Sequence, residues 1–398
     1  METEILVIGG GATGCGVAWD AALRGFATVL VERGALASGT TGRFHGLLHS
    51  GARYAVTDPV AAQECASESA ILRRIAPACV ADTGGLVLAL PGDDPGYVER
   101  FPDACAAAGI EVAEARSGDH PAVSQDAVQA FSVPDAVLDG RALVQACARA
   151  ARRAGAVVLE QARVVRFLRA GTAVAGAVVR RGDRELELHA PVVVNAAGAW
   201  AGAVATLAGC GVPARLSAGV LVAVTGPEGP AVPIVVSRCR APGDGDIVVP
   251  LGGELVIGTT DTPVDYPEGL PDPDPAVPGL LAAGADLVPG IAEAVAAGAR
   301  PRAWTAVRPL VAGTAAPPGT SSGRGLSRGH LVIDHAFADR VGGLITVTGG
   351  KATTFRLMAE DAVDAACRIL GSREPCRTAG ERLDAGGVPG GESGTLAP

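Results

Sequence analysis

The chain has 398 residues, enough for two domains that each bury a core of their own. A net charge of −9 without a basic stripe excludes the usual nucleic-acid binders. Nine cysteines stand singly, so neither a disulfide framework nor a cysteine-ligated metal site is indicated. No apolar run has the length of a membrane span and no basic region precedes the first apolar stretch, which predicts a cytoplasmic protein without a transmembrane segment or metal.

A glycine-rich turn near the N-terminus is the most specific motif. Residues 5–8 predict a buried strand, and Gly9, Gly11 and Gly14 follow it in the Gly-x-Gly-x-x-Gly spacing. Gly9 permits a tight turn, Gly11 lets backbone N–H groups approach a pyrophosphate, and Gly14 lets strand and helix pack closely. The next helix directs its positive dipole end at the phosphates. The predicted dinucleotide contacts in this turn are Gly9, Gly11, Ala12, Thr13 and Gly14.

A second apolar run, residues 27–31, ends on Glu32, whose carboxylate can accept hydrogen bonds from the adenosine ribose. The hydroxyl-rich loop 38–42 can wrap a pyrophosphate or a ribityl chain. The alternative is a plain βαβ unit in a chain with 55 glycines, and the ordered succession of strand, turn, helix, strand and acid argues against it. These residues do not distinguish NAD from FAD.

Residues 43–54 concentrate polar chemistry in a short stretch. They include His45, His49, Arg53 and Tyr54, in a chain with only six histidines and three tyrosines. This density predicts an active-site segment with anion-binding and proton-transfer groups, and a solvated loop is the alternative.

Lys351 is a second candidate for a site residue, because it is the sole lysine among 33 basic residues. The alternative is that Lys351 is an ordinary surface residue.

The remaining helical and strand patterns lack a regular βαβ rhythm, which predicts an inserted antiparallel sheet. Residues 190–200 predict a buried strand ending in small residues, which allow close approach of a cofactor. The predicted helices are 60–80, 97–109, 139–154, 279–297 and 352–370. The predicted strands are 86–90, 128–133, 156–160, 163–169, 173–180, a meander over 216–262, and a strand and turn over 343–351. A proline-rich loop is predicted over 263–279 and a disordered tail over 372–398.

The chain carries six motifs whose kind and order resemble those of the FAD-dependent glycerol-3-phosphate dehydrogenase family, nearest its anaerobic catalytic A subunits. This family lies within the D-amino-acid-oxidase-like superfamily. The resemblance spans roughly residues 1–376. Its motifs are the glycine turn with Glu32, residues 45–54, residues 195–198, residues 258–261, residues 307–310, and residues 349–351 with 356–360.

The resemblance implies an α/β fold. A Rossmann-like FAD-binding domain of the D-amino-acid-oxidase/glutathione-reductase-2 type would carry an inserted substrate domain built on a mixed or antiparallel sheet. The predicted FAD-binding domain comprises residues 1–83, 139–213 and 306–371. The predicted substrate domain comprises residues 84–138 and 214–305.

The resemblance also implies non-covalent FAD and oxidation of sn-glycerol 3-phosphate to dihydroxyacetone phosphate, with hydride transfer from C2 to the flavin N5. A covalent link through His45 or His49 stays open. The turn at 349–350 and the following helix would direct backbone donors and a dipole at the charge of the reduced flavin, and Lys351 would add a cation. For the base that takes the hydroxyl proton, His49 is the first choice, His335 the second and His45 the third, since an imidazole titrates near neutrality. A structural histidine is the alternative for each.

The site residues follow from these matches. The predicted catalytic residues are His49, Arg308, Lys351 and His335. The predicted substrate contacts are Arg53, Tyr54, Arg308, Arg328 and Lys351, where charge-assisted hydrogen bonds contribute about 1.5–3 kcal/mol each. The predicted cofactor contacts beyond the first turn are Glu32, Arg33, Thr40, Thr41, His45, Gly46, Leu47, Val164, Ala197, Gly198, Trp200, Gly349, Gly350, Lys351, Ala352 and Thr353.

The sequence departs from the anaerobic family in one respect, since only Cys376 lies beyond the last helix where that family clusters cysteines. Electrons would then pass to partner subunits, a quinone pathway, a soluble acceptor or oxygen, with the protein cytoplasmic or peripheral to the inner face of the membrane. Two alternatives stay open: a related flavoenzyme for another hydroxy acid, phosphonate or amine, and a flavin-carrying protein that only relays electrons. A carboxylate substrate would need fewer than the four predicted cations, which are Arg53, Arg308, Arg328 and Lys351. The dense segment 43–54 argues against a protein that only relays electrons.

Overall fold

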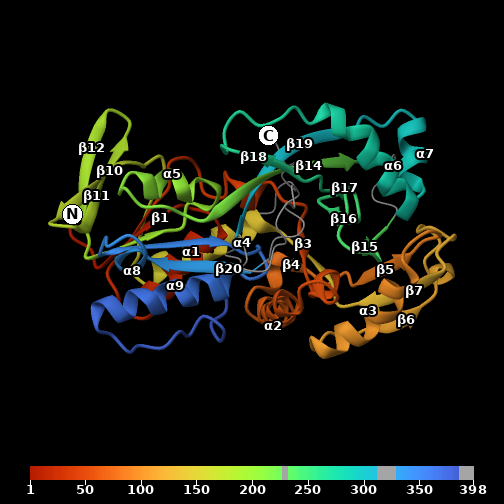
Figure 1. The fold of residues 1–398 in the computed structure, drawn as a ribbon, viewed down its shortest axis with the longest axis horizontal. Helices are drawn as coiled ribbons and strands as arrows, with labels where there is room; N and C mark the ends of the chain where they lie inside the picture. Colours follow the sequence, from red (N-terminus) through yellow and green to blue (C-terminus); the bar gives the residue numbers. More distant parts are fainter. Residues whose placement is uncertain (226–231, 312–328, 385–398) are drawn as a thin grey trace.

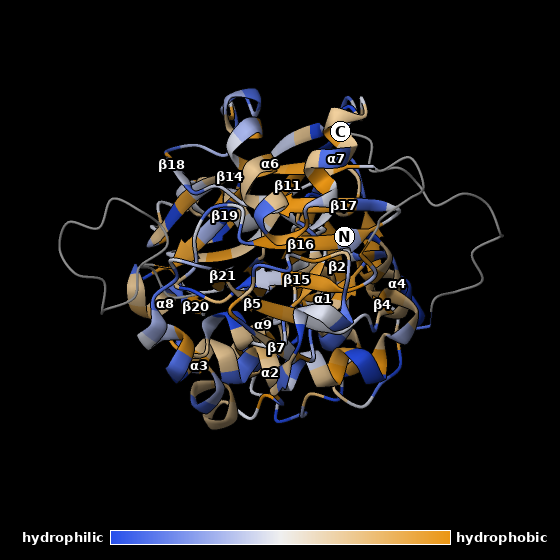
Figure 2. Cartoon of the chain, turned by 90° about the vertical axis from the view of Figure 1, so that its right-hand side faces the viewer, coloured by the Kyte–Doolittle hydropathy of each residue, from blue (hydrophilic) through white to orange (hydrophobic). Residues whose placement is uncertain are grey.

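The computed structural model describes residues 1–225, 232–311 and 329–384, which form two large sheets with helices packed around them (Figure 1). Apolar residues concentrate in the strands of the interior and polar residues on the outer helices and loops (Figure 2). Within the described ranges, no helix combines the length and the apolar character needed to cross a bilayer.

The first sheet has six strands and is parallel except at one edge. In spatial order its strands are β20 (His330–Asp334), β21 (Leu344–Gly349), β13 (Val192–Asn195), β1 (Ile5–Ile8), β2 (Thr28–Val31) and β9 (Val157–Leu159). β1, β2 and β13 are buried at every position, as expected for parallel strands covered on both faces. The predicted buried strands before the glycine turn, before Glu32 and before residue 196 are therefore confirmed.

Different layers cover the two faces of this sheet. On one face lie α1 (Ala12–Leu23), α4 (Gly140–Arg153) and α9 (Phe355–Leu370), which share a core with Ile5 and Val7. On the other face the antiparallel sheet β10 (Arg163–Ala170), β11 (Ala173–Arg181) and β12 (Arg184–His189), with α5 (Ala201–Thr206), shares a core with Leu6.

The second sheet has nine strands and is mostly antiparallel. Its order is β18 (Thr262–Val264), β14 (Ala214–Val224), β17 (Glu254–Gly258), β16 (Ile247–Leu251), β15 (Val235–Arg238), β5 (Gly85–Ala89), β7 (Gln129–Val133) and β6 (Ala113–Ala115), with β19 (Arg302–Val311) also on β14. It confirms the predicted mixed or antiparallel sheet. The predicted boundary before residue 306 falls inside β19, which pairs with β14 along its whole length. The rest of the two-domain division stays a prediction.

Helices on the second sheet differ from the predicted pattern at one point. Instead of a single helix over 279–297, the chain forms α6 (Val277–Leu287) and α7 (Gly290–Ala296). Pro289 lies between them, and proline lacks the N–H that a continuing helix needs. α3 (Pro95–Ala107) packs Phe101 against Phe131 of β7 on the same sheet.

A second small sheet, of three strands, positions the dense segment of residues 43–54. Its strands are β3 (Leu47–Leu48), β8 (Ala136–Leu138) and β4 (Val80–Ala81). After β3 the chain turns at Gly51, forms a short 3-10 helix over Ala52–Tyr54, and enters α2 (Pro59–Ile75). Because β3 and β8 are paired, the histidines and Arg53 are held against the core instead of lying in a free loop.

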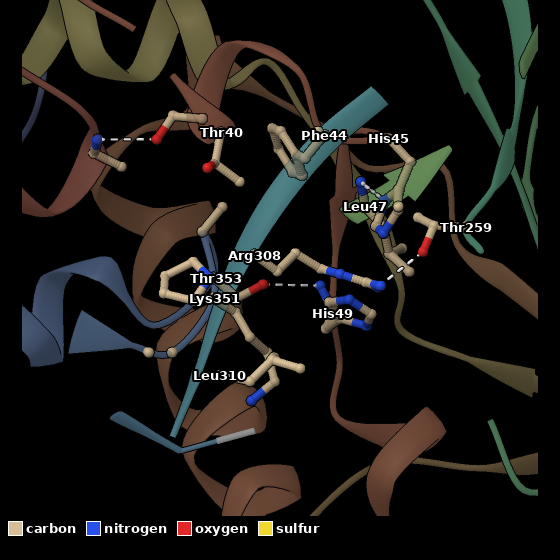
Figure 3. A pocket seen from close by; sticks show the side chains of 18 of the residues that line it. Thr40, Phe44, His45, Leu47, His49, Thr259, Arg308, Leu310, Lys351 and Thr353 are labelled. Atoms are coloured by element: carbon tan, nitrogen blue, oxygen red, sulfur yellow. Dashed lines mark hydrogen bonds between the residues drawn. The ribbon is translucent and has the colours of Figure 1, made fainter. Parts of the chain in front are cut away.

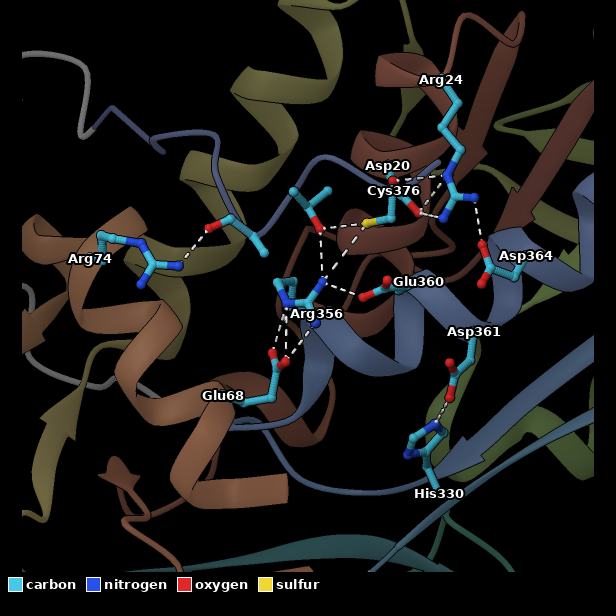
Figure 4. A network of polar contacts seen from close by, with 12 residues as sticks. Asp20, Arg24, Glu68, Arg74, His330, Arg356, Glu360, Asp361, Asp364 and Cys376 are labelled. Carbon is cyan, nitrogen blue, oxygen red and sulfur yellow. Dashed lines mark hydrogen bonds and ion pairs between the residues drawn. The ribbon is translucent and has the colours of Figure 1, made fainter. Parts of the chain in front are cut away.

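Residues 372–384 pack against the end of α1 and against α9, whereas the composition predicts a disordered tail from residue 372. Thr378 and Leu383 are almost fully buried. Cys376 lies within hydrogen-bond distance of the Arg356 guanidinium (Figure 4). The Thr378 hydroxyl also accepts from this guanidinium, and Arg24 donates to the carbonyl oxygen of Glu374. Both arginines lie outside the segment, so its composition alone carries no sign of its anchoring. Residues 385–398 lie outside the described residues.

Arg356 also forms a buried ion pair that fastens α9 to α2. Its Nη2 lies 2.6 Å from Glu68 Oε1, with both side chains almost fully buried. Arg356→Met is expected to lower the free energy of unfolding by about 3–5 kcal/mol, since it leaves the Glu68 carboxylate buried and unpaired. Chemical denaturation measures this, with Arg368→Met, on the exposed side of the same helix, as the matched control. Equal stability of the two variants would contradict the prediction.

Candidate functional site

Two adjoining pockets lie where the two large sheets meet. One, of about 1060 Å³, follows the carboxyl ends of β1, β2 and β13, the position at which parallel sheets bind ligands. The other, of about 220 Å³, lies between that end of the first sheet and β14 and β19 of the second. We name them the dinucleotide pocket and the inner pocket. Both are lined by Ala12, Thr13, Thr40, Thr41 and Gly198, so they form one continuous groove.

The glycine turn has the geometry that a pyrophosphate requires. Gly9 has a φ of +115°, a conformation that side-chain-bearing residues rarely adopt. A Cβ on Gly14 would lie 1.9 Å from the Gly9 carbonyl oxygen, so only glycine permits this contact of helix and strand. The Thr41 hydroxyl accepts a hydrogen bond from the N–H of Ala12 at the start of α1. The turn and the helix N-terminus therefore fit the diphosphate of a dinucleotide.

Glu32 closes the far side of the same turn. Its two carboxylate oxygens accept hydrogen bonds of 2.7 Å from the N–H groups of Gly10 and Gly34. A carboxylate oxygen has a further lone pair, so Glu32 can also accept from a ribose hydroxyl. This fits the predicted role, although the carboxylate additionally holds the backbone of the turn.

The inner pocket brings together side chains from three separate parts of the chain (Figure 3). His45, His49, Arg53 and Tyr54 come from the dense segment, Arg308 from β19, and Lys351 from the turn after β21. The rings of His45 and His49 meet edge to face with centroids 5.9 Å apart, and the His49 ring lies 5.2 Å from that of Tyr54. His49 is buried, and its backbone N–H donates to the Thr353 hydroxyl.

His45 is held as a neutral imidazole. Burial, with Arg53 and Arg308 nearby, lowers its pKa to about 3. Its Nδ1 accepts from the N–H of Leu47, so the ring proton is on Nε2. A ring with so low a pKa is a weak proton acceptor at neutral pH, which disfavours His45 as the base.

The lowered pKa of His45 makes its contribution to stability depend on pH. A histidine with a depressed folded-state pKa favours folding above the unfolded value of about 6.5, and this contribution is lost as the pH falls toward 3. The stability difference between wild type and His45→Asn should therefore shrink by up to about 1.4 kcal/mol per pH unit below 6.5. Urea denaturation of both proteins at pH 7.5, 6 and 5 measures it, and a difference independent of pH would refute the prediction.

Arg308 is fixed by a cradle on the second sheet. Its Nη1 donates to the Thr259 hydroxyl at 2.8 Å, and its Nη2 lies 3.1 Å from Asp261 Oδ1. Nη2 also donates to the Ser217 hydroxyl and to the carbonyl oxygen of Thr260. Ser217 was not predicted as a site residue. It lies on β14 opposite Arg308, a pairing that no local sequence pattern indicates.

Arg53 and Lys351 supply two further cationic groups. Arg53 has a buried side chain that lies 3.5 Å from Asp246 Oδ2, and its Nη1 has no hydrogen-bond partner among the described residues. The Lys351 ammonium group lies 4.7 Å from the centre of the Tyr54 ring. An orphaned buried guanidinium nitrogen costs free energy unless a ligand satisfies it, which suits an anionic substrate.

His335 does not lie in the groove, so the structure does not support its predicted place as the second choice of base. It is fully buried on α8 (His335–Ala338), with Nδ1 2.5 Å from Asp339 and Nε2 2.8 Å from the Thr346 hydroxyl. Its ligand atoms lie within 4.8 Å of those of Cys210 and Asp339, a set that could hold a metal. Both ring nitrogens already have protein partners, so the arrangement is accounted for as a structural histidine.

The other predicted residues divide as follows. Gly14 and Gly46 lie beside the groove and do not line it, and Arg328 lies outside the described residues. The predicted cofactor contacts that line the groove are Gly9, Gly11, Ala12, Thr13, Glu32, Arg33, Thr40, Thr41, His45, Leu47, Val164, Ala197, Gly198, Trp200, Gly349, Gly350, Lys351, Ala352 and Thr353. Asp246, Asp261 and Glu268 also touch site residues and were not predicted as site residues. Asp261 lies in the motif 258–261, whereas nothing in the sequence singles out Asp246 or Glu268.

Comparison with known proteins agrees with this geometry. Residues 4–356 match the family described as FAD dependent oxidoreductase. The chain is 44% identical to the A subunit of the anaerobic glycerol-3-phosphate dehydrogenase from Escherichia coli (strain K12), over 95% of the chain and 69% of that protein. It is 40% identical to the A1 subunit of the enzyme with the same name from Haloferax volcanii, over 99% of the chain and 67% of that protein.

Solved structures show the same fold. The glycerol-3-phosphate dehydrogenase from Bacillus halodurans, complexed with FAD, matches with a TM-score of 0.70 and 26% identity, over 96% of this chain and 68% of that one. The L-alpha-glycerophosphate oxidase from Mycoplasma pneumoniae, at 17% identity, matches with a TM-score of 0.75 over 96% and 99% of the two chains. The chain is an FAD-dependent oxidoreductase of the D-amino-acid-oxidase fold. It belongs, more narrowly, to the family of anaerobic glycerol-3-phosphate dehydrogenase A subunits.

Proposed function

We propose that the chain oxidises sn-glycerol 3-phosphate to dihydroxyacetone phosphate. The main support is the convergence of Arg53, Arg308 and Lys351 on a pocket that continues the dinucleotide pocket. FAD, when bound in the groove, supplies the hydride acceptor. The relatives that cover most of the chain are named for this substrate, and the family is FAD-dependent.

Three of the four predicted cations line the inner pocket, and the fourth, Arg328, lies outside the described residues. Such a set suits a phosphorylated substrate better than an uncharged alcohol. A phosphate dianion that leaves water needs several charge-assisted hydrogen bonds, worth about 1.5–3 kcal/mol each. Arg308 is held rigidly by its cradle, so it can orient the substrate, while Arg53 offers Nη1 and Lys351 a compact ammonium group. We assign phosphate binding to this group as a whole.

His49 is the proposed base for the C2 hydroxyl proton. It lines the inner pocket, is buried, and is oriented by its backbone hydrogen bond to Thr353. Neighbouring His45, with a pKa of about 3, is suited to donate a hydrogen bond through Nε2 instead. The two histidines therefore have separate proposed roles.

We further propose that the electrons leave through partner subunits. The relatives from Escherichia coli and Haloferax volcanii are named as the A and A1 subunits of their enzymes. Such an enzyme would act in the cytoplasm or at the inner face of the membrane. Co-purification of a tagged chain with the proteins that accept its electrons tests this.

The proposed substrate is tested by anaerobic titration of the holoprotein with glycerol 3-phosphate while the absorbance of the oxidised flavin is recorded. Stoichiometric bleaching is the expected result. No bleaching, with dithionite still reducing the flavin, would refute the proposal and favour another phosphorylated alcohol, a phosphonate or a 2-hydroxy acid. Glycerol without phosphate serves as the control and should leave the absorbance unchanged.

A further inference from the structure

One carboxylate reaches the dinucleotide pocket from the opposite sheet. Of the described residues that line this pocket, Glu268 is the one that comes from beyond residue 207. It lies in the segment that follows β18, an edge strand of the nine-stranded sheet, whereas the other lining residues belong to the six-stranded sheet, to the layers that cover it or to the loop 38–41. Glu268 therefore bridges the two halves of the molecule at the pocket.

Glu268 holds two residues of the pocket wall at once. Its Oε1 accepts a hydrogen bond from Nε1 of Trp200 and lies 3.4 Å from Nη1 of Arg33. The Arg33 guanidinium in turn stacks on the Trp200 ring, 4.1 Å from its centre. Arg33 follows Glu32 at the end of β2, and Trp200 follows β13, so these contacts tie both strand ends to the loop.

The loop that presents Glu268 is anchored on both sides. Before it, β18 pairs with β14, and the Pro271 carbonyl oxygen after it accepts a hydrogen bond of 3.0 Å from the Thr305 hydroxyl. Pro267, immediately before Glu268, is buried and restricts the backbone further. The backbone on both sides of Glu268 is therefore held in place, and the contacts with Trp200 and Arg33 position its exposed side chain.

We infer that Glu268, with Arg33 and Trp200, forms a clasp that retains FAD by slowing its passage into and out of the dinucleotide pocket. The clasp contacts join protein to protein across the pocket, so they oppose entry and release alike. A contact that must break while the ligand passes, but has the same strength before and after binding, slows both entry and release. It leaves the affinity nearly unaltered. The inference rests on FAD as the cofactor and does not depend on the substrate proposed above.

The test compares FAD exchange in wild type, Glu268→Ala and Glu268→Gln. Uptake is followed by stopped-flow mixing of apoprotein with FAD and release by dilution of holoprotein, both through flavin fluorescence. For Glu268→Ala we expect both rates to rise about tenfold, as the loss of a charge-assisted hydrogen bond and an exposed ion pair implies, with Kd changed by less than about threefold. Glu268→Gln keeps an acceptor for Trp200 and should give an intermediate increase.

Asp265→Ala is the matched control, since this exposed acid lies in the same loop and does not line the pocket. Its exchange rates should equal those of wild type. Unchanged release from Glu268→Ala would overturn the clasp. So would faster release with unchanged uptake, which would make Glu268 a direct FAD ligand. Failure of glycerol 3-phosphate to bleach the flavin leaves this test intact, because exchange is measured without substrate.

Discussion

Arg308→Ala is expected to lower kcat/KM for glycerol 3-phosphate by about 10³-fold, equivalent to about 4 kcal/mol of transition-state stabilisation. The change removes a charged donor from the inner pocket and leaves Asp261, whose side chain is almost fully buried, without this partner. Because the cradle of Thr259, Thr260 and Asp261 fixes the guanidinium before substrate arrives, little of its binding energy is spent on ordering it. Stopped-flow reduction of the holoprotein at several substrate concentrations gives the reduction rate constant and the substrate Kd, and their ratio reports the same loss.

The matched control is Arg215→Ala. Arg215 lies on β14 beside the same strand β19, opposite Leu310, but its side chain is exposed and it does not line the inner pocket. Its kcat/KM should stay within about twofold of wild type, as for other surface substitutions. Turnover by Arg308→Ala at the wild-type rate would exclude Arg308 from the site and revive the hypothesis of a flavin-carrying protein that only relays electrons.

Lys351→Met is expected to slow flavin reduction by about 10²-fold and to lower the midpoint potential of the bound flavin by about 30 mV or more. Lys351 follows Gly349 and Gly350, whose positive φ angles form the turn before α9. Its cation favours negative charge in the inner pocket, both on the substrate and on the reduced cofactor. Methionine keeps an unbranched side chain of similar length and removes the charge together with the N–H donors of the ammonium group.

The control for Lys351 is Lys351→Arg, which keeps the charge but replaces the compact ammonium group with a planar one. It should restore most of the midpoint potential and only part of the reduction rate, since the contact with the Tyr54 ring changes shape. An unchanged potential in Lys351→Met would mean that the ammonium group does not act on the flavin. The potential is measured by dye-coupled spectrophotometric titration.

The site could be predicted from the sequence wherever its chemistry is local. The turn from Gly9 to Gly14 depends on backbone conformations and close contacts that only glycine allows, so its spacing is visible in the chain itself. The segment from His45 to Tyr54 is similarly compact. Lys351 stood out because the composition had left a single lysine.

Partners that come from distant strands could not be predicted in this way. Ser217 meets Arg308 only because β14 pairs with β19 in one register, and Glu268 reaches Trp200 only because the second sheet packs beside the first. His335 illustrates the reverse error. A histidine near the C-terminal strands resembles a candidate base in sequence, but packing places it in the core with Asp339 and Thr346.

The amino-acid sequence by itself determined the glycine turn with its dinucleotide chemistry and the positions of the buried strands. It also determined the segments that carry the histidines and Lys351. Each of these depends on neighbours within a few residues or on one repeated period. The tertiary structure alone decided which cations share a pocket, that His45 is neutral, that residues 372–384 are anchored, and that Glu268 spans the groove. Those properties arise from burial and from contacts between separate segments of the chain, which no local pattern encodes.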